Sequence, residues 1–342
     1  MFQILHDVNI DWLGGRRWFI GVSVLLMLAG LGSAILRQAT GREAFNLGVD
    51  FKGGTVVTVR FKQRPTDDAI RTALVSKNIR DAVVQPVTDK TDTVLIKVPL
   101  EGEGQDGRAR VRGALNEFGT EAAPDKDLET DGNAAYKIVG TDAVGAIAGA
   151  QLRNKAIAVT LAALVGILIY IAARFEWTYG AAAVIAVFHD VLVTLGFFSM
   201  FQWEVSLTVI AALLTLVGFS VNDTIVVFDR IRENRKLHRR DSLYKITNDS
   251  INQTLSRTVI ANGLVFLSVL AMVLFGGEVL RGFSLALFIG VVFGTYSSIA
   301  VASPIMVWWE QRLEAANREA ALSFNQPRVV KQARTQRAGS KV

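Results

Sequence analysis

Long apolar runs dominate the chain, and most of its polar residues lie between them. Six of these runs approach or exceed the ~18–20 apolar residues that an α-helix needs to cross a bilayer. They cover residues 17–36, 156–173, 179–201, 205–228, 258–275 and 283–307. The pattern predicts a polytopic α-helical membrane protein with six transmembrane helices.

Residues 37–155, between the first two runs, follow a different pattern. TVVTVRF alternates apolar and polar positions with β-branched residues, which indicates a strand. Strands are predicted at 55–61, 81–87, 93–100 and 134–140, and helices at 66–78, with Thr66 as N-cap, and 108–119. The order βαββαβ predicts an inserted α+β ferredoxin-like domain. Residues 101–107 and 120–133 are expected to be exposed loops, and 141–160 a helix that returns to the membrane.

The distribution of charge predicts the topology. The chain carries a formal charge of +6 and 51% hydrophobic residues. Lys and Arg gather before the first run, in the 229–257 connection and in the tail, whereas 201–205 and 276–282 hold few. Because short cytoplasmic loops are enriched in basic residues, we expect both termini in the cytoplasm and residues 37–155 outside. The positive charge therefore orients the helices and faces lipid headgroups, and nucleic acid is not an expected partner.

These observations predict five parts. They are a cytoplasmic N-terminus (1–15), a first transmembrane helix (16–36) that is an uncleaved anchor, an extracytoplasmic α+β domain with its return helix (37–155), five further transmembrane helices (156–309) and a basic cytoplasmic tail (310–342). The chain has no cysteine, so disulfides and cysteine-ligated metals are excluded.

Five polar residues interrupt the apolar runs and are the candidate proton pathway. Asn222 and Asp223 lie in the fourth run, His189 and Asp190 in the third, and Arg257 at the start of the fifth. An ionised side chain at mid-membrane costs several kcal/mol, so such residues usually face a bundle interior and take part in function.

The antiparallel course of the fourth and fifth helices allows an ion pair between Asp223 and Arg257. A carboxylate that burial and a nearby cation push in opposite directions can load and release a proton. Three structural alternatives stay open: Asp223 could be an interhelical hydrogen-bonding group, Arg257 could extend to the headgroups, and His189 could bond a neighbouring hydroxyl.

NLGVDFKGG, residues 46–54, links the first apolar run to the first strand. Gly53 and Gly54 permit a turn with positive φ, and Asp50 can cap it by bonding nearby backbone N–H groups. The residues alone favour a structural turn. Phosphate-binding glycine loops, HExxH and nucleophile-elbow patterns are absent from the sequence, so we expect no enzyme and no cofactor, with a proton or Na⁺ as the coupling ion.

Three stretches together resemble the SecF family of bacterial protein export, part of the RND superfamily. They are GVDFKGG (48–54), FHDVLVTLGF (188–197) and VGFSVNDTIVVFDRIRENR (217–235). The resemblance implies a bacterial inner-membrane subunit that pairs with SecD, associates with SecYEG, and uses the proton gradient to draw unfolded preproteins outward. YajC and YidC are further implied partners.

The resemblance also implies roles for single residues. Asp223 falls on the family's membrane aspartate and Arg257 on its arginine at the start of the fifth helix, both implicated in proton passage. Asp190, Gly53 and Gly54 fall on other motif positions. Two alternatives remain: an RND-type exporter of small molecules or lipids, which half of that architecture disfavours, and a scaffold subunit that transports nothing.

Overall fold

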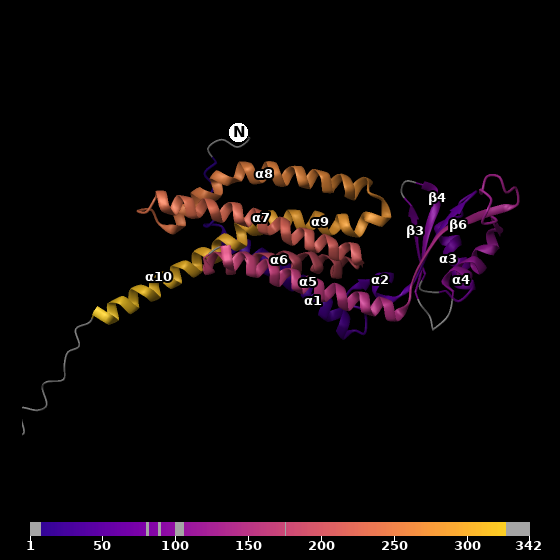
Figure 1. Ribbon diagram of the computed structural model, residues 1–342, viewed down its shortest axis with the longest axis horizontal. Helices are drawn as coiled ribbons and strands as arrows, with labels where there is room; N and C mark the ends of the chain where they lie inside the picture. Colours follow the sequence, from indigo (N-terminus) through magenta and orange to yellow (C-terminus); the bar gives the residue numbers. More distant parts are fainter. Residues whose placement is uncertain (1–7, 80–81, 88–89, 100–105, 175, 326–342) are drawn as a thin grey trace, which may run out of the picture.

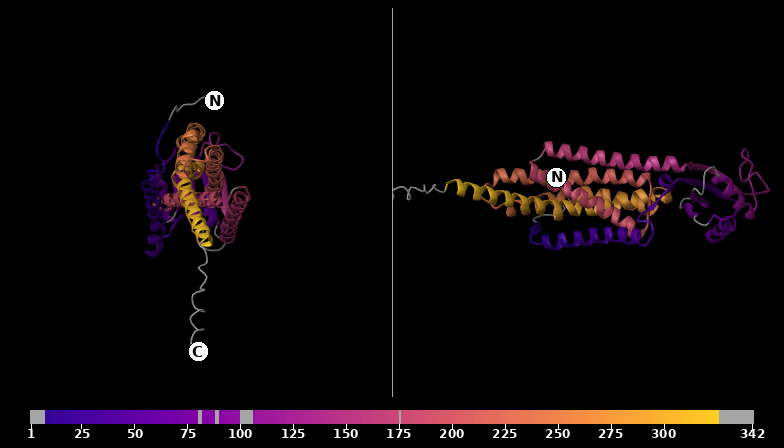
Figure 2. Two further views of the ribbon diagram at one scale, coloured as in Figure 1. Left: turned by 90° about the vertical axis from the view of Figure 1, so that its left-hand side faces the viewer. Right: turned by 90° about the horizontal axis from the view of Figure 1, so that it is seen from below.

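A bundle of long helices forms one end of the molecule and a sheet domain the other (Figures 1 and 2). The computed structural model describes residues 8–79, 82–87, 90–99, 106–174 and 176–325. Within that part of the chain, six helical segments are long and apolar enough to cross a membrane, as predicted. They are α1 (Arg16–Ala39), α5 (Ala146–Arg174), α6 (Trp177–Phe201), α7 (Leu207–Leu237), α8 (Leu243–Phe275), and α9 (Gly277–Ser297) continued by α10 (Ser303–Asn325).

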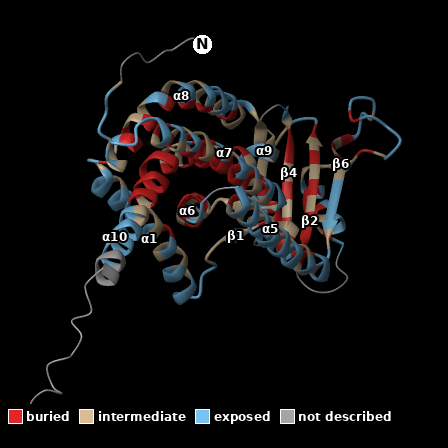
Figure 3. Cartoon of the chain, turned by 60° about the vertical axis from the view of Figure 1, so that its left-hand side comes forward, coloured by how far each residue is buried: buried red, intermediate tan, exposed pale blue. Residues whose placement is uncertain are grey.

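α9 and α10 are joined by a π-helical turn, η2 (Ser298–Ala302), all of whose residues are buried. Such turns are rare and occur often at functional sites. The inner helices are α6, α7 and the α9–α10 segment, in whose most apolar stretches 56%, 50% and 67% of residues are buried. The outer helices are α1, α5 and α8, with 11%, 6% and 17%. Figure 3 shows the same contrast between buried inner helices and exposed outer ones. The outer faces are apolar because lipid surrounds them.

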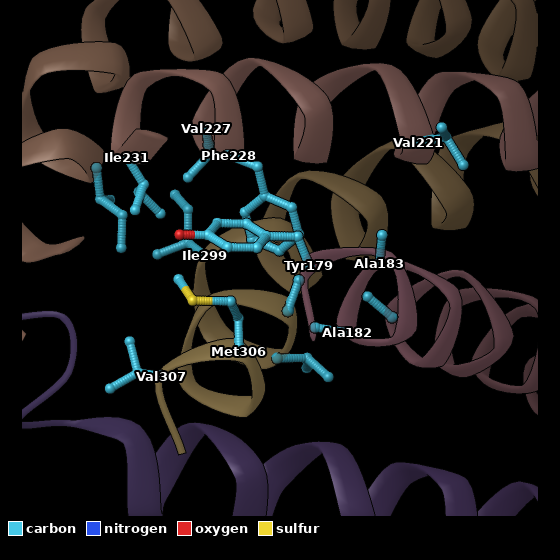
Figure 4. Packing of buried hydrophobic residues seen from close by; sticks show 14 of the residues in the cluster. Tyr179, Ala182, Ala183, Val221, Val227, Phe228, Ile231, Ile299, Met306 and Val307 are labelled. Atoms are coloured by element: carbon cyan, nitrogen blue, oxygen red, sulfur yellow. The ribbon is translucent and has the colours of Figure 1, made fainter. Parts of the chain in front are cut away.

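The bundle contains two apolar clusters, one toward each end. The cluster far from the sheet centres on Tyr179 of α6, whose ring packs edge-on against Phe228 of α7 with centroids 5.3 Å apart. Figure 4 shows Tyr179 among Phe228, Ile299 and Met306. The cluster near the sheet joins Phe198, the start of α7 and part of α9.

The sheet domain contains five strands in the order β3-β4-β2-β6-β5. Its elements in chain order are β2 (Gly54–Phe61), α3 (Asp67–Ser76), β3 (Val83–Val87), β4 (Lys90–Pro99), α4 (Gly107–Leu115), the 3-10 turn η1 (Asn116–Phe118), β5 (Thr120–Glu121) and β6 (Ala134–Val144). Neighbouring strands are antiparallel except β5 and β6. α3 and α4 cover one face over a core of Val, Ile, Leu, Phe and Tyr side chains. Thr66 caps α3 as predicted, because its hydroxyl accepts the Ala69 N–H at 3.3 Å.

The structure differs from the sequence-based expectations in four places. Residues 141–144 continue strand β6 rather than beginning a helix, because β2 offers them a ladder of hydrogen bonds. Residues 120–133 are not simply exposed, since they contain β5 and the buried Ala122 and Leu128. The 229–257 connection is mostly helical, with only 238–242 between α7 and α8. The expected tail is helical as far as Asn325, and 326–342 lie outside the described residues, as do 1–7 and 100–105.

Residues 8–15 are held against the start of α8. The Asn248 and Asn252 amides both donate to the Ile10 carbonyl, at 2.9 and 3.0 Å, and Asn248 also accepts the Trp12 N–H at 2.8 Å. The segment before α1 is thereby fixed to the end of the bundle far from the sheet.

Candidate functional site

A layer of polar side chains crosses the middle of the bundle, where the surrounding helices are apolar. Asp190 lies at its centre, near the midpoint of α6, and is fully buried. Its Oδ2 accepts the hydroxyls of Ser220 on α7, at 2.5 Å, and Ser297 on α9, at 2.8 Å. Its Oδ1 lies 2.9 Å from Nδ1 of His189. Three helices therefore meet on one carboxylate.

His189 is buried with Asp190, and its second ring nitrogen has no hydrogen-bond partner among the described residues. The ring borders an apolar cavity of about 500 Å³ between α1, α6 and the end of η2. The alternative that His189 bonds a neighbouring hydroxyl is wrong, because its partner is the adjacent carboxylate.

Asp223 lies less than one helical turn after Ser220 on α7 and is 5% exposed. Its Oδ1 accepts the Thr258 hydroxyl of α8 at 3.2 Å, and Asn262 and Ser298 lie beside the same carboxylate. Its Oδ2 is buried and has no hydrogen-bond partner among the described residues. A buried carboxylate oxygen without a hydrogen-bond partner is energetically costly when the carboxylate is charged. That cost disappears when the carboxylate binds a proton.

The predicted ion pair between Asp223 and Arg257 is not formed. Both residues are described, yet no salt bridge joins them; Thr258, the next residue on α8, occupies the place against Asp223. Arg257 is exposed and lines a small pocket with Tyr170, Arg174 and Asp229. Successive helical residues point about 100° apart, so Arg257 and Thr258 cannot both face α7 directly.

Asn222 also points elsewhere than predicted. It is exposed on the outer surface of α7, whereas Asp223 faces inward. The two adjacent polar residues of the sequence motif therefore point in different directions, Asp223 into the bundle and Asn222 away from it.

The Asp50–Gly54 turn joins the sheet domain to the bundle. Gly53 and Gly54 have the predicted positive φ, +81° and +154°, and a Cβ at Gly54 would lie 2.6 Å from the Val98 carbonyl. Asp50 does not cap its own turn. Its Oδ2 accepts the N–H of Leu207, 157 residues away, at the first turn of α7. A carboxylate there satisfies an orphan N–H and complements the helix dipole.

Two further contacts strengthen this junction. β1 (Asn46–Leu47) pairs in parallel with β7 (Glu204–Val205), and Gly48 at the start of α2 (Val49–Lys52) donates its N–H to the Val205 carbonyl at 2.8 Å. Lys97 of β4 pairs with Glu204 at 2.5 Å. The sheet domain is thus attached to the start of the helix that carries Asp223.

The sequence reasoning missed the hydroxyl and amide side chains that surround the carboxylates. They are Ser220, Thr224, Thr258, Asn262, Ser297 and Ser298. Ser220 lies three residues before Asp223, so the sequence places both on the same side of a helix. Serine and threonine are common in membrane helices, however, and their presence alone does not indicate a functional site.

An inserted sheet domain and six apolar helices around buried carboxylates define a polytopic membrane transport protein. Residues 125–312 match the model for the protein export membrane protein SecD/SecF, C-terminal, and residues 44–63 match the SecD/SecF GG motif. The chain belongs to the SecF family of protein translocase subunits.

Named relatives support this membership. The chain is 39% identical to protein translocase subunit SecF of Koribacter versatilis, over 90% of this chain and 94% of that one, and 39% identical to that of Escherichia coli O157:H7, over 89% of each. The crystal structure of SecDF from Thermus thermophilus superposes with a TM-score of 0.73 at 36% identity, over 89% of this chain and 39% of that one. The chain therefore spans about two fifths of SecDF. The relatives' names also confirm a transport component rather than an enzyme.

Proposed function

We propose that this chain, with a SecD-type partner, uses the proton gradient to promote preprotein translocation across the bacterial inner membrane, with Asp223 as the proton-binding group. The observation that carries the proposal is the buried carboxylate of Asp223, one oxygen of which has no hydrogen-bond partner in the described part of the chain. Protonation removes the charge and turns that oxygen into a donor, so the packing of α7, α8 and η2 responds to a single proton.

The sheet domain is, in this proposal, a ferredoxin-like domain outside the membrane. Its strand order β3-β4-β2-β6, with α3 and α4 on one face, supports the ferredoxin-like assignment. Both termini are then cytoplasmic, since the sequence of the tail is basic and basic residues are also dense around the 238–242 turn, which lies at the end of the bundle opposite the sheet.

Helix α7 carries a surface suited to the partner. Its exposed residues Thr208, Ala211, Thr215, Gly218 and Asn222 repeat at helical spacing and are small or polar. Small residues let helices approach closely in a membrane, and an exposed Asn finds a hydrogen bond only across such an interface. This surface supports pairing with SecD, which the Thermus relative's name joins to SecF in one chain. SecYEG, YajC and YidC are proposed on family membership alone.

The junction links proton binding at Asp223 to movement of the sheet domain. Asp50 and Glu204 attach the sheet domain to the first turn of α7, and Asp223 lies farther along the same helix. A tilt or rotation of α7 on protonation would therefore move the external domain, which engages emerging unfolded polypeptide by surface contacts.

The test is preprotein translocation into vesicles that contain the full export complex, with and without a proton gradient. We expect Asp223→Asn to abolish the stimulation by the gradient while leaving assembly with the partner intact. Asp241→Asn in the 238–242 turn, which removes a surface pair with Lys245, is the matched control and should respond like the wild type.

Two results would redirect the proposal. An equal response of Asp223→Asn and wild type would mean that the chain is a scaffold. Stimulation by a Na⁺ gradient, in vesicles whose proton gradient has been collapsed, would make Na⁺ the coupling ion.

A further inference from the structure

The two buried carboxylates are joined by adjacent serines of one helix. Ser297, the last residue of α9, donates to Asp190 at 2.8 Å. Ser298, the first residue of η2, lies 2.9 Å from the Thr224 hydroxyl and beside Asp223. Asp190 belongs to α6 and Asp223 to α7, so neighbouring residues of a third element face both carboxylates.

The serines also compete for one acceptor. The hydroxyls of Ser297 and Ser298 lie 3.2 and 3.1 Å from the Gly294 carbonyl oxygen, which also receives the Ser298 backbone N–H. A carbonyl has two lone pairs, so three donors cannot all be well satisfied there. At least one serine hydroxyl must donate elsewhere, and the alternatives are Asp190 for Ser297 and Thr224 or Asp223 for Ser298.

The state of Asp190 therefore sets what Ser298 can do. When Asp190 is ionised it accepts from Ser297, and the Gly294 carbonyl is left to Ser298. Protonation of Asp190 at Oδ2 removes the charge and leaves that oxygen one lone pair for the two hydroxyls of Ser220 and Ser297, so Ser297 turns toward Gly294. Ser298 is then displaced from Gly294, and of its two other acceptors, Thr224 and Asp223, Asp223 is the one whose Oδ2 lacks a hydrogen-bond partner among the described residues.

We propose that Ser297 and Ser298 are positioning residues that couple the protonation of Asp190 to that of Asp223 through the shared Gly294 carbonyl. The inference rests on the proposed function, because Asp223 must bind the coupling proton. It adds a second titrating site and gives the junction between α9 and the π-helical turn a purpose: the junction holds two successive hydroxyls against two different helices. The titratable groups facing this network are His189 and Asp190 from α6 and Asp223 from α7. On α8 the residue that faces it is Thr258, and the charged Arg257 beside it points outward. The described residues of α9 and η2 that face it contribute hydroxyls.

The test measures gradient-driven translocation by the full complex over a series of pH values, and its readout is the pH midpoint. We expect Asp190→Asn to move the midpoint by about one pH unit in the wild-type background, the size expected for changing one hydrogen bond to a charged group. In the Ser297→Ala/Ser298→Ala background, the same substitution should leave the midpoint where it is. Ser298→Thr, which keeps the hydroxyl, should behave like the wild type.

Ser268→Ala is the matched control, because Ser268 is exposed on α8 and bonds only its own helix, at Leu264. In that background Asp190→Asn should shift the midpoint as in the wild type. If the double alanine variant does not accumulate, Ser298→Cys, of similar size but a weak donor, takes its place and should reduce the shift.

The coupling is wrong if Asp190→Asn leaves the wild-type midpoint unchanged or shifts both backgrounds equally. That failure differs from failure of the proposed function, which would show as a normal response of Asp223→Asn to the gradient.

Discussion

In the sheet domain, the side chains between the sheet and its two helices are almost entirely apolar, and charged residues such as Arg60 and Asp92 lie at the surface. In the bundle, the outer faces are apolar and the middle holds Asp190, Asp223 and a ring of hydroxyls. Water drives apolar groups inward in the first region, whereas lipid removes that drive in the second. Buried charge in the bundle is therefore tolerated only where the fold supplies partners, and the proposed proton-binding group, Asp223, is one such residue.

The largest effect is expected when a carboxylate is placed in the apolar core of the sheet domain. Val59 on β2 is fully buried, and Val59→Asp is expected to destabilise the sheet domain by more than about 4 kcal/mol, because the side chains of the core around it are almost all apolar. Hydrogen exchange of the sheet amides in the full-length protein measures the loss.

Val139 on the neighbouring strand is the control, since it is 53% exposed. Val139→Asp should leave the exchange rates within the range of ordinary surface substitutions, about 0.5 kcal/mol. Equal protection of the sheet in both variants would mean that the sheet domain tolerates buried charge as the bundle does.

A smaller effect is expected where the bundle depends on close packing. A Cβ at Gly30 of α1 would lie 2.4 Å from the Gly196 Cα on α6, so the two helices touch through backbone. Gly30→Ala must separate them and is expected to cost about 1–3 kcal/mol, measured by thermal unfolding in nanodiscs. Gly32, two residues along, has open space around it, and Gly32→Ala should be neutral or slightly stabilising. Equal melting temperatures for the two variants would contradict the close packing.

The sequence was sufficient to predict both the six helices and the burial of Asp190 and Asp223. A charged residue in a long apolar run faces either lipid or the interior of the helix bundle, and the interior is the less costly environment. Length and hydropathy also fix the depth of a residue along its helix.

The rotation of each helix about its axis was not predictable in the same way. α8 has a mixed outer face, so the sequence could not decide whether Arg257 or Thr258 meets Asp223. The partner of Asp50 was equally inaccessible, because it bonds an N–H in a helix 157 residues away. Contacts of this kind depend on the packing of whole elements, which a local pattern does not contain.

The smallest expected effect concerns charge at the surface of the sheet domain. A hydrogen bond from the Arg60 guanidinium, at 2.6 Å, and another from the Thr93 hydroxyl hold the pKa of Asp92 below its usual value of 3.8. A lowered carboxylate pKa stabilises the fold above the unfolded-state value, and the contribution disappears as pH falls through the folded-state value. Asp92→Asn should therefore lower the protection of β2 and β4 amides from hydrogen exchange at pH 7 and not near pH 2. The effect at pH 7 should be slight, because solvent screens a pair at the surface. If wild type and Asp92→Asn still differ in amide protection at low pH, Asp92 acts by packing and not by its charge. The surface of the sheet domain would then offer no example of a charge that contributes to stability through a screened pair.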